Sequence, residues 1–176
     1  TDNASFTIEG SNLKINSSPD YETKSSYSVR IKTTDSGELS YEEVVTLNVN
    51  DVNDVATDIS LSATSFNENI NAASTVATLS TTDADSGDTH TYEFVSGEGD
   101  TDNDSFTIEG SNLKISSSPD YETQSSYKIR LKTTDSGGLS YEEAISLSVG
   151  DLIDEIPSDI SLSSINFNEN INAAST

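Results

Sequence analysis

The chain repeats itself after about 100 residues. The segment TDNASFTIEGSNLKINSSPDYET, which begins at Thr1, returns as TDNDSFTIEGSNLKISSSPDYET at Thr101. The segment FNENINAAST ends at Thr75 and again at Thr176, so one residue was gained between the copies. Repetition at a fixed period indicates units of one kind, and about 100 residues is an ordinary size for one compact domain. We therefore expect the chain to be part of a tandem array.

Two acidic segments mark the expected domain boundaries. They are DVNDVATD, which begins at Asp51, and DLIDEIPSD, which begins at Asp151. Both are polar, as connections between domains are. The predicted order is the later part of one repeat (1–50), a linker (51–57), a complete repeat (58–150), a second linker (151–157) and the start of a third repeat (158–176).

The charge balance restricts the partners. The chain has 31 acidic and 8 basic residues, a formal net charge of −23. Nucleic acid and anionic membranes are unfavourable partners, because binding to either needs clustered lysine and arginine. Two explanations of the acidity stay open together: a solubilising surface, and carboxylates that bind hard divalent cations. Because the chain has no cysteine, no disulfide can stabilise it, and calcium is the obvious alternative.

Apolar and polar residues alternate with a period of two over much of the sequence. The runs 127–133 and 145–149 each predict one half-buried β-strand. Shorter candidate strands are 59–61, 76–79, 91–94, 106–108 and 113–115. Turn clusters rich in Gly, Asp and Ser separate these runs, and no stretch shows a sustained helical period. About seven short strands in roughly 100 residues predict an all-β fold, an antiparallel Greek-key β-sandwich of immunoglobulin-like type.

The acidic residues of one repeat fall at the ends of the predicted strands. They are Glu68, Asp83, Asp85, Asp120, Glu122, Asp135, Asp151 and Asp154. Calcium takes about six to eight oxygen ligands at a flexible site. Spacings such as DxD and DxE place two carboxylates on one side of an extended chain, where both can face one ion. The alternative is that these acids only cap turns and protect strand edges from aggregation.

The ordered set of motifs resembles a cadherin repeat over the whole chain. FNENI at Phe66 is similar to the ExN-type motif of the family, and the DADSG segment at Asp83 is similar to its DxD motif. PDYET at Pro119 resembles the DRE-type motif, and the strand that follows it ends in a DxG-like motif at Asp135. DVND at Asp51 resembles the DxNDN linker. The pattern is similar to the cadherin-like repeats of large bacterial surface proteins.

The resemblance implies calcium at the junctions between successive repeats. The implied ligands of the first junction are Asp20, Glu22, Asp51, Asn53 and Asp54 from the earlier repeat and linker, with Asp83, Asp85 and Asp135 from the later repeat. Those of the second junction are Glu68, Asp120, Glu122, Asp151 and Asp154. Two positions depart from the family pattern, because Val55 and Ile153 stand where the family has asparagine.

The remaining polar motifs carry weaker signals. His90 is the only histidine, and we expect it on the surface of a strand rather than as a catalyst or ligand. The segment DTDND at Asp100 has alternating acids but lacks the glycine and the distal glutamate of an EF-hand loop. No Ser-His-Asp arrangement is evident. We therefore expect no enzyme.

Two functions remain open from the sequence. The first is an extracellular repeat of a secreted bacterial surface protein, a calcium-stiffened spacer in an adhesin that contacts neighbouring repeats of the same protein. The second is a module that itself binds a polysaccharide or a matching repeat on another cell. The candidates for a sugar platform are Tyr21, Tyr41, Tyr121 and Tyr141. No run approaches the roughly 18 apolar residues of a membrane-spanning helix, so membrane insertion is not expected.

Overall fold

The computed structural model of the chain describes residues 1–153 and residue 169. The described chain is built from β-strands, with two single-turn 3-10 helices, η1 (Asn3–Ser5) and η2 (Asn103–Ser105). Within this part, no helix is long and apolar enough to cross a membrane. Residues 154–157 of the predicted second linker, which include Asp154, and the predicted third repeat apart from Glu169 lie outside the described residues.

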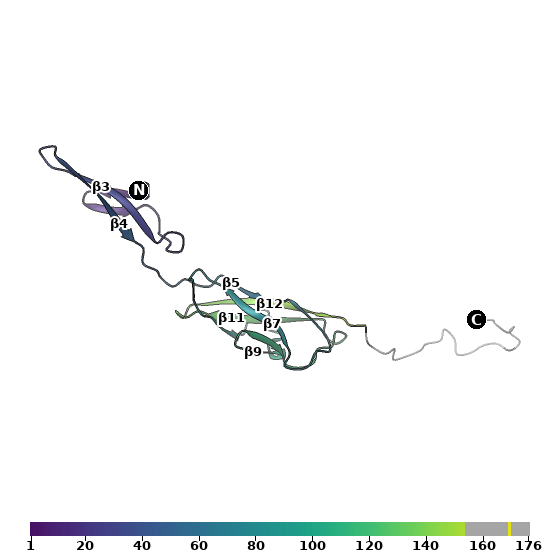
Figure 1. Cartoon of the computed structure of the whole chain (residues 1–176). Coiled ribbons are helices and arrows are strands. Elements are labelled where there is room, and N and C mark those ends of the chain that lie inside the picture. Colours follow the sequence, from purple (N-terminus) through teal and green to yellow (C-terminus); the bar gives the residue numbers. More distant parts are fainter. Residues whose placement is uncertain (154–168, 170–176) are drawn as a thin grey trace.

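Residues 58–150 form a two-layered structure, called the sandwich below (Figure 1). Its strands are β5 (Asp58–Leu61), β6 (Ser65–Asn67), β7 (Thr75–Thr82), β8 (Thr91–Phe94), β9 (Phe106–Glu109), β10 (Asn112–Ile115), β11 (Ser126–Thr134) and β12 (Ser140–Gly150). One sheet has the order β5-β7-β10-β9 and the other β6-β12-β11-β8. Neighbouring strands are antiparallel, except that β6 runs parallel to the end of β12. The predicted immunoglobulin-like sandwich is confirmed.

The sandwich has one strand more than the sequence predicted. Strand β6 has only three residues, which is too few to show an alternating pattern. Its place is set by pairing with β12, where Phe66 lies opposite Val149. The seven predicted strands are all present, and β12 begins at Ser140 rather than at the predicted Ile145. The additional residues of β12 pair with β11, as in the pair of Glu142 with Lys132.

The core lies between the two sheets. Leu113 comes from one sheet, and Ile129, Leu131 and Leu147 come from the other; none of the four is more than 1% exposed. Three aromatic rings, those of Phe66, Phe106 and Tyr127, pack with centroids 5.3–6.2 Å apart. The alternating pattern of β11, in which every second side chain is buried, is what the sequence predicted.

Residues 6–48 form four strands that correspond in sequence to β9–β12, called the hairpin pair below. They are β1 (Phe6–Glu9), β2 (Asn12–Ile15), β3 (Ser26–Thr34) and β4 (Ser40–Asn48). Strands β1 and β2 form one two-stranded sheet, and β3 and β4 form another. Their facing sides line an open apolar groove with Phe6, Leu13, Tyr27 and Leu47 on its walls. In the sandwich, side chains of β6 and β7 cover the corresponding residues.

The DTDND segment attaches to the edge of β11. Asp102 accepts hydrogen bonds from the Lys128 amide at 2.6 Å and from the Gln124 side chain at 2.9 Å. Asn103 accepts one from the Arg130 amide at 2.9 Å. The hairpin pair repeats the arrangement, because Asp2 and Asn3 bond the amides of Ser28 and Arg30. These aspartate and asparagine side chains therefore satisfy strand-edge amides, and in the sandwich these are amides that β8 does not reach.

Candidate metal centre

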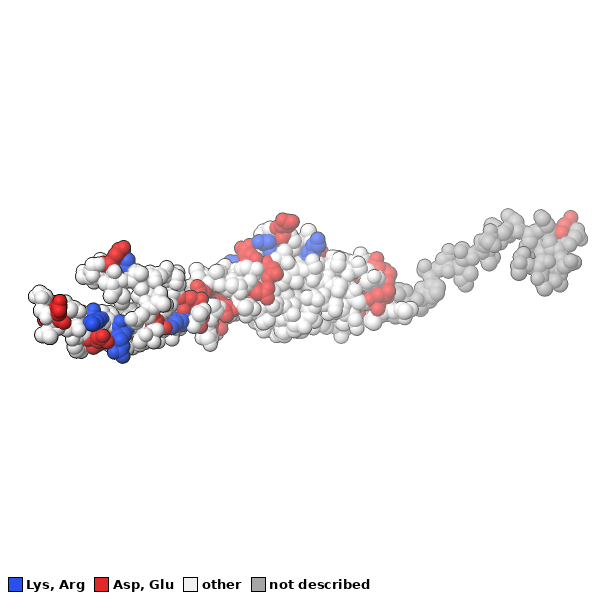
Figure 2. Space-filling model, turned by 90° about the horizontal axis from the view of Figure 1, so that it is seen from above, with Lys and Arg blue, Asp and Glu red and all other residues white. Residues whose placement is uncertain are grey.

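Three groups of carboxylates converge in the described part of the chain. They are Glu22, Asp51 and Asp85; Asp83, Asp88 and Asp135; and Glu68, Asp120 and Glu122. Within each group, one oxygen of every member lies within 4.8 Å of the others. Figure 2 shows acidic side chains gathered where the hairpin pair meets the sandwich and again at the far end of the sandwich. The groups lie at the two ends of the sandwich, where junctions were predicted.

The first group spans the linker. Glu22 belongs to the turn before β3, Asp51 to the linker, and Asp85 to the turn after β7. The Asp54 amide donates to the Asp85 carboxylate at 2.7 Å and fixes the linker against the sandwich. The pKa of Glu22 lies above its ordinary value: a backbone hydrogen bond, the largest influence, lowers it, but desolvation and the charges of neighbouring aspartates outweigh that bond. Like charges are thus held together across the linker.

The second group lies beside the first and is also tied to the linker. The Asn53 side chain donates to Asp135 at 3.0 Å. Gly137 makes this approach possible, because a Cβ there would lie 2.1 Å from the Asn53 side-chain oxygen. Burial, the largest influence, raises the pKa of Asp135, but hydrogen bonds from Asn53 and from backbone amides such as that of Leu139 lower it below its ordinary value. Asp135 is therefore held in its charged form.

His90 contacts this group, contrary to the prediction that it lies on the surface of a strand. It precedes β8, its side chain is 13% exposed, and its Nε2 lies 2.9 Å from Asp83. The hydrogen bond with His90 is the main reason why the pKa of Asp83 lies below its ordinary value. No local pattern of residues predicts this contact, because it depends on the turn between β7 and β8 folding back.

The third group lies at the opposite end of the sandwich. Glu68 is 2% exposed, and its two carboxylate oxygens accept hydrogen bonds from the amides of Tyr121 at 2.8 Å and Leu152 at 2.7 Å. Asp120 accepts two hydrogen bonds from Thr123. Glu68 thereby joins the turn before β11 to the segment that leaves β12.

Most of the predicted ligands are brought together. Asp83, Asp85, Asp135, Glu22, Asp51, Glu68, Asp120 and Glu122 lie in the three groups, and Asn53 and Asp54 bond to members of them. Two predicted ligands stand apart among the described residues. Asp20 accepts hydrogen bonds from the Thr23 amide and hydroxyl, which lower its pKa, and Asp151 is exposed and joins no group.

Asp88 is a member that the sequence analysis missed. It stands five residues after Asp83 in a turn, and only the fold of that turn brings the two carboxylates together. A DxD motif followed within one turn by a further aspartate is the signal that points to it.

The donor chemistry of the first two groups fits a calcium ion. All the converging atoms are carboxylate oxygens, which hard divalent cations prefer. In Asp88, a residue of the second group, the Oδ2 atom is buried and has no hydrogen-bond partner in the described structure. A buried charged oxygen without a partner is costly, and a bound cation would satisfy it. Glu22, Asp51 and Asp85 would hold one ion across the linker, and Asp83 and Asp135 would hold another; bound calcium supplies positive charge that neutralises them.

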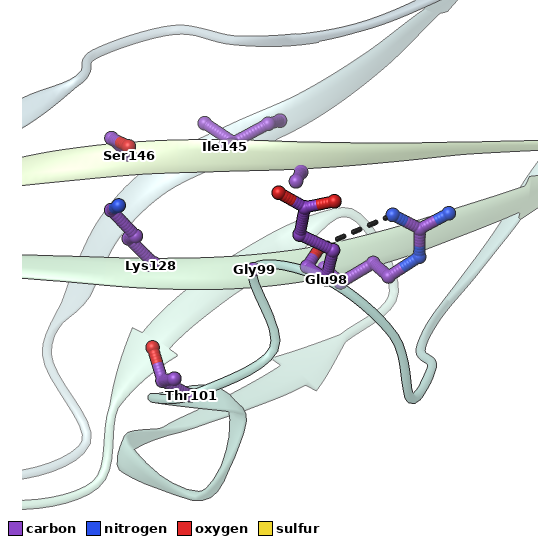
Figure 3. Close-up of a pocket in the computed structure, with 8 residues that line it drawn as sticks. Glu98, Gly99, Thr101, Lys128, Ile145 and Ser146 are labelled. Carbon is purple, nitrogen blue, oxygen red and sulfur yellow. Dashed lines mark hydrogen bonds between the residues drawn. The ribbon is translucent and has the colours of Figure 1, made fainter.

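The outer face of the sandwich carries a separate hollow of about 420 Å³ (Figure 3). The loop of Glu98 and Gly99 lies over β11 and β12 there, and Gly99 packs so closely on Ala144 that a Cβ would lie 2.7 Å from it. Arg130 is occupied by Glu142 and by the Glu98 carbonyl. None of the residues that line this hollow forms a nucleophile–base pair.

Comparison with known proteins identifies the family. The cadherin domain, as a sequence family, matches residues 62–149, half of the chain. The chain belongs to the cadherin domain family. A search of curated proteins gave no significant match.

Solved cadherin domains share the fold. Extracellular cadherin domains 1–4 of protocadherin gamma B7 are 24% identical, with a TM-score of 0.58 over 84% of this chain and 38% of that chain. The first two domains of human protocadherin-24 are 25% identical, with a TM-score of 0.66 over 86% of this chain and 79% of that chain. This chain spans less than half the length of the protocadherin gamma structures that it matches. Cadherin domains are in general extracellular, non-enzymatic adhesion modules that bind calcium.

Proposed function

We propose that the chain is part of a tandem array of cadherin repeats that calcium stiffens, a spacer in a large surface adhesin of the bacterial type. The proposed domains are the later part of one repeat (1–50), a complete repeat (58–150) and the start of a third repeat (158–176), with linkers at 51–57 and 151–157. The near-identity of the two copies supports the array. The bacterial assignment follows from the resemblance of the sequence motifs.

The observation that carries the proposal is the group of Glu22, Asp51 and Asp85. Its carboxylates come from both sides of the linker and lie within 4.8 Å of one another. Without a cation they repel one another and favour a bent junction; with calcium they are drawn onto a shared ion and the junction straightens. The hydrogen bonds of Asn53 and Asp54 with the sandwich hold the linker close to these carboxylates.

Calcium should stabilise the folded chain. Extracellular modules bind calcium with a Kd of about 0.1–1 mM. At roughly 100 times the Kd, linkage contributes about 2.7 kcal/mol, which for a domain of this size raises the Tm by roughly 10–20 °C. Melting in calcium and in chelator measures the shift, and an unchanged Tm would overturn the proposal.

The stiffening mechanism has its own test. Replacing Asp83 and Asp85 by asparagine keeps their shape and removes two anionic ligands. In calcium, small-angle X-ray scattering should then give a shorter maximum dimension than that of the parent chain. Equal dimensions would mean that these ions do not hold the junction straight.

Direct binding of a polysaccharide or of a matching repeat is the alternative. Tyr121 and Tyr141 pack partly against the core of the sandwich, which argues against a tyrosine platform there. Tyr41 of the hairpin pair is 64% exposed. A glycan array and sedimentation of the chain separate these alternatives from a spacer, which should bind no sugar and stay monomeric.

A further inference from the structure

We propose that the apolar groove of the hairpin pair binds residues 166–171 of a second copy of this chain. In this contact the ring of Phe167 fills the groove, as the ring of Phe66 fills the equivalent space in the sandwich. Of the segment 166–171, only Glu169 lies within the described residues. The contact goes beyond the proposed function, because a spacer needs no contact between copies.

The groove is built from the same residues as the site of Phe66. In the sandwich, Phe66 packs against the rings of Phe106 and Tyr127, whose centroids are 6.2 and 6.0 Å away. The equivalent residues, Phe6 and Tyr27, both line the groove, which has a volume of about 560 Å³. The other walls also repeat the sandwich, because Leu13, Ile15, Pro19 and Leu47 stand at the positions of the buried residues Leu113, Ile115, Pro119 and Leu147.

The two aromatic rings of the groove already have the geometry that receives a third ring. The centroids of Phe6 and Tyr27 lie 5.4 Å apart at an interplanar angle of 87°. Those of Phe106 and Tyr127 in the sandwich lie 5.3 Å apart at 84°. Edge-to-face pairs of this kind are a preferred arrangement of aromatic side chains. Phe167 can therefore enter the groove without a rearrangement of either ring.

The end of β4 offers a place for the backbone of the docked segment. In the sandwich, β12 continues to Gly150, and β6 pairs in parallel with its last three residues. In the hairpin pair, β4 ends at Asn48, so Val49 and Asn50 lie outside the strand. A docked segment that places Phe167 opposite Val49 extends β4 by the pairing that β6 makes. Addition of a strand to a sheet edge is a common mode of peptide recognition.

The docked segment has the sequence of the strand that fills the sandwich. The ten residues FNENINAAST occur once from β6 onward and once at 167–176. In the sandwich, the Glu68 carboxylate also accepts a hydrogen bond from the Tyr121 amide at 2.8 Å. Glu169 and Tyr21 are the equivalent residues. The segment therefore brings the ring, the backbone and a polar anchor that the groove fits.

A second copy supplies the segment, because the same chain is too short to reach its own groove. Twelve residues, 154–165, connect Ile153 to the segment and span at most about 43 Å. Strand β12 alone has 11 residues, about 36 Å, and the linker 51–57 adds to this separation. The contact is therefore head to tail, and such a contact between identical chains continues into a filament unless it closes into a ring.

The main test mixes two variants of the full chain in chelator, at about 0.15 M salt to screen repulsion between the acidic copies. Phe167→Ala removes the donor ring and keeps the groove, and Leu47→Arg blocks the groove and keeps the donor. In analytical ultracentrifugation, the parent should associate further as its concentration rises. Each variant alone should stay monomeric. Their equimolar mixture should form a dimer that does not grow, because it holds one intact groove and one intact donor.

A peptide measurement covers the case in which Leu47→Arg disturbs the hairpin pair. A synthetic peptide of residues 158–176, added up to about 1 mM to the full chain with Phe167→Ala, should shift the NMR signals of the Phe6 and Tyr27 rings. The same peptide with Phe167→Ala should bind at least about tenfold more weakly. The matched control is the peptide with Ile165→Ala, which should bind like the parent peptide because Ile165 corresponds to the exposed Thr64.

The outcomes distinguish this contact from the proposed function. Association that is lost in Phe167→Ala and restored by mixing is the groove contact, and it does not argue against a spacer. Association that persists in Phe167→Ala means that the copies meet through another surface, as binding of a matching repeat requires, and overturns the inference. Ring signals of Phe6 and Tyr27 that stay fixed with the peptide overturn it as well. The calcium measurements do not depend on Phe167, so their failure would leave this inference standing.

Discussion

The hairpin pair and the matching strands of the sandwich have nearly the same sequence but very different burial. Leu13 is 36% exposed, whereas Leu113 is completely buried; Ile15 is 38% exposed, and Ile115 is 1% exposed. Both regions pair in the same register, as in Arg30 with Val44 and Arg130 with Ala144. Local pairing therefore follows from the local sequence in both copies.

The difference in burial between the two regions follows from the strands that flank them. In the sandwich, β10 lies between β9 and β7, while β2 has only β1 beside it in the described structure. Val76, Ala77 and Leu79 of β7 belong to the core cluster that covers Leu113. An alternating strand thus specifies which face is apolar, but the strands beside it in the sheet decide how completely that face is buried and how much free energy the burial contributes.

Truncation of the two equivalent leucines should give the largest difference between the regions. Leu113→Ala leaves a cavity between two packed sheets and should lower the free energy of unfolding by about 2–5 kcal/mol. Leu13→Ala removes a side chain that already contacts solvent and should cost about 1 kcal/mol or less. Urea denaturation followed by circular dichroism measures both. Equal losses would show that the hairpin pair is covered in solution.

A substitution at two equivalent glycines should give a smaller difference. Gly137→Ala places a Cβ on the Asn53 side chain, so Asn53 should lose its hydrogen bond to Asp135 and the linker should loosen. At Gly37 the nearest atom to a Cβ is the Asp35 carboxylate at 3.4 Å, so Gly37→Ala should be tolerated. We expect a Tm lower by a few degrees and a weaker response to calcium only for Gly137→Ala. The same response in both variants would contradict the role of the linker contact.

The smallest effects are expected at the surface, where the regions are alike. Lys14 pairs with Glu9, and Lys114 pairs with Glu109, in both cases across a hairpin. Exposed ion pairs contribute little to the free energy of unfolding. Lys14→Ala and Lys114→Ala should therefore each shift the Tm by no more than about 2 °C. Thermal melts at low and high salt check this. A large shift for Lys114→Ala alone would mean that the sandwich depends on surface charge as well as on its core.

The positions of the predicted metal ligands show how much of the candidate site follows from the sequence. Asp83, Asp85 and Asp135 follow strand ends that alternation located correctly, so their place at one end of the sandwich was predictable. Asp20 resembles Asp120 in sequence, yet in the described structure only Asp120 joins a group, because Glu68 lies beside it. Asp20 and Asp120 stand in the same motif, but only Asp120 has Glu68, the residue after β6, beside it.

The repeat, seven of the eight strands of the sandwich, their inward faces and the resemblance to the family can all be derived from the sequence, because they depend on period and on local pairing. The contacts between segments that are distant along the chain become visible only in the folded molecule. These include the parallel pairing of β6, the approach of Asn53 over Gly137, the contact of His90 with Asp83, and the convergence of Asp88 on Asp135. Such contacts depend on how loops fold back onto a packed core, and no local pattern of residue types encodes that geometry.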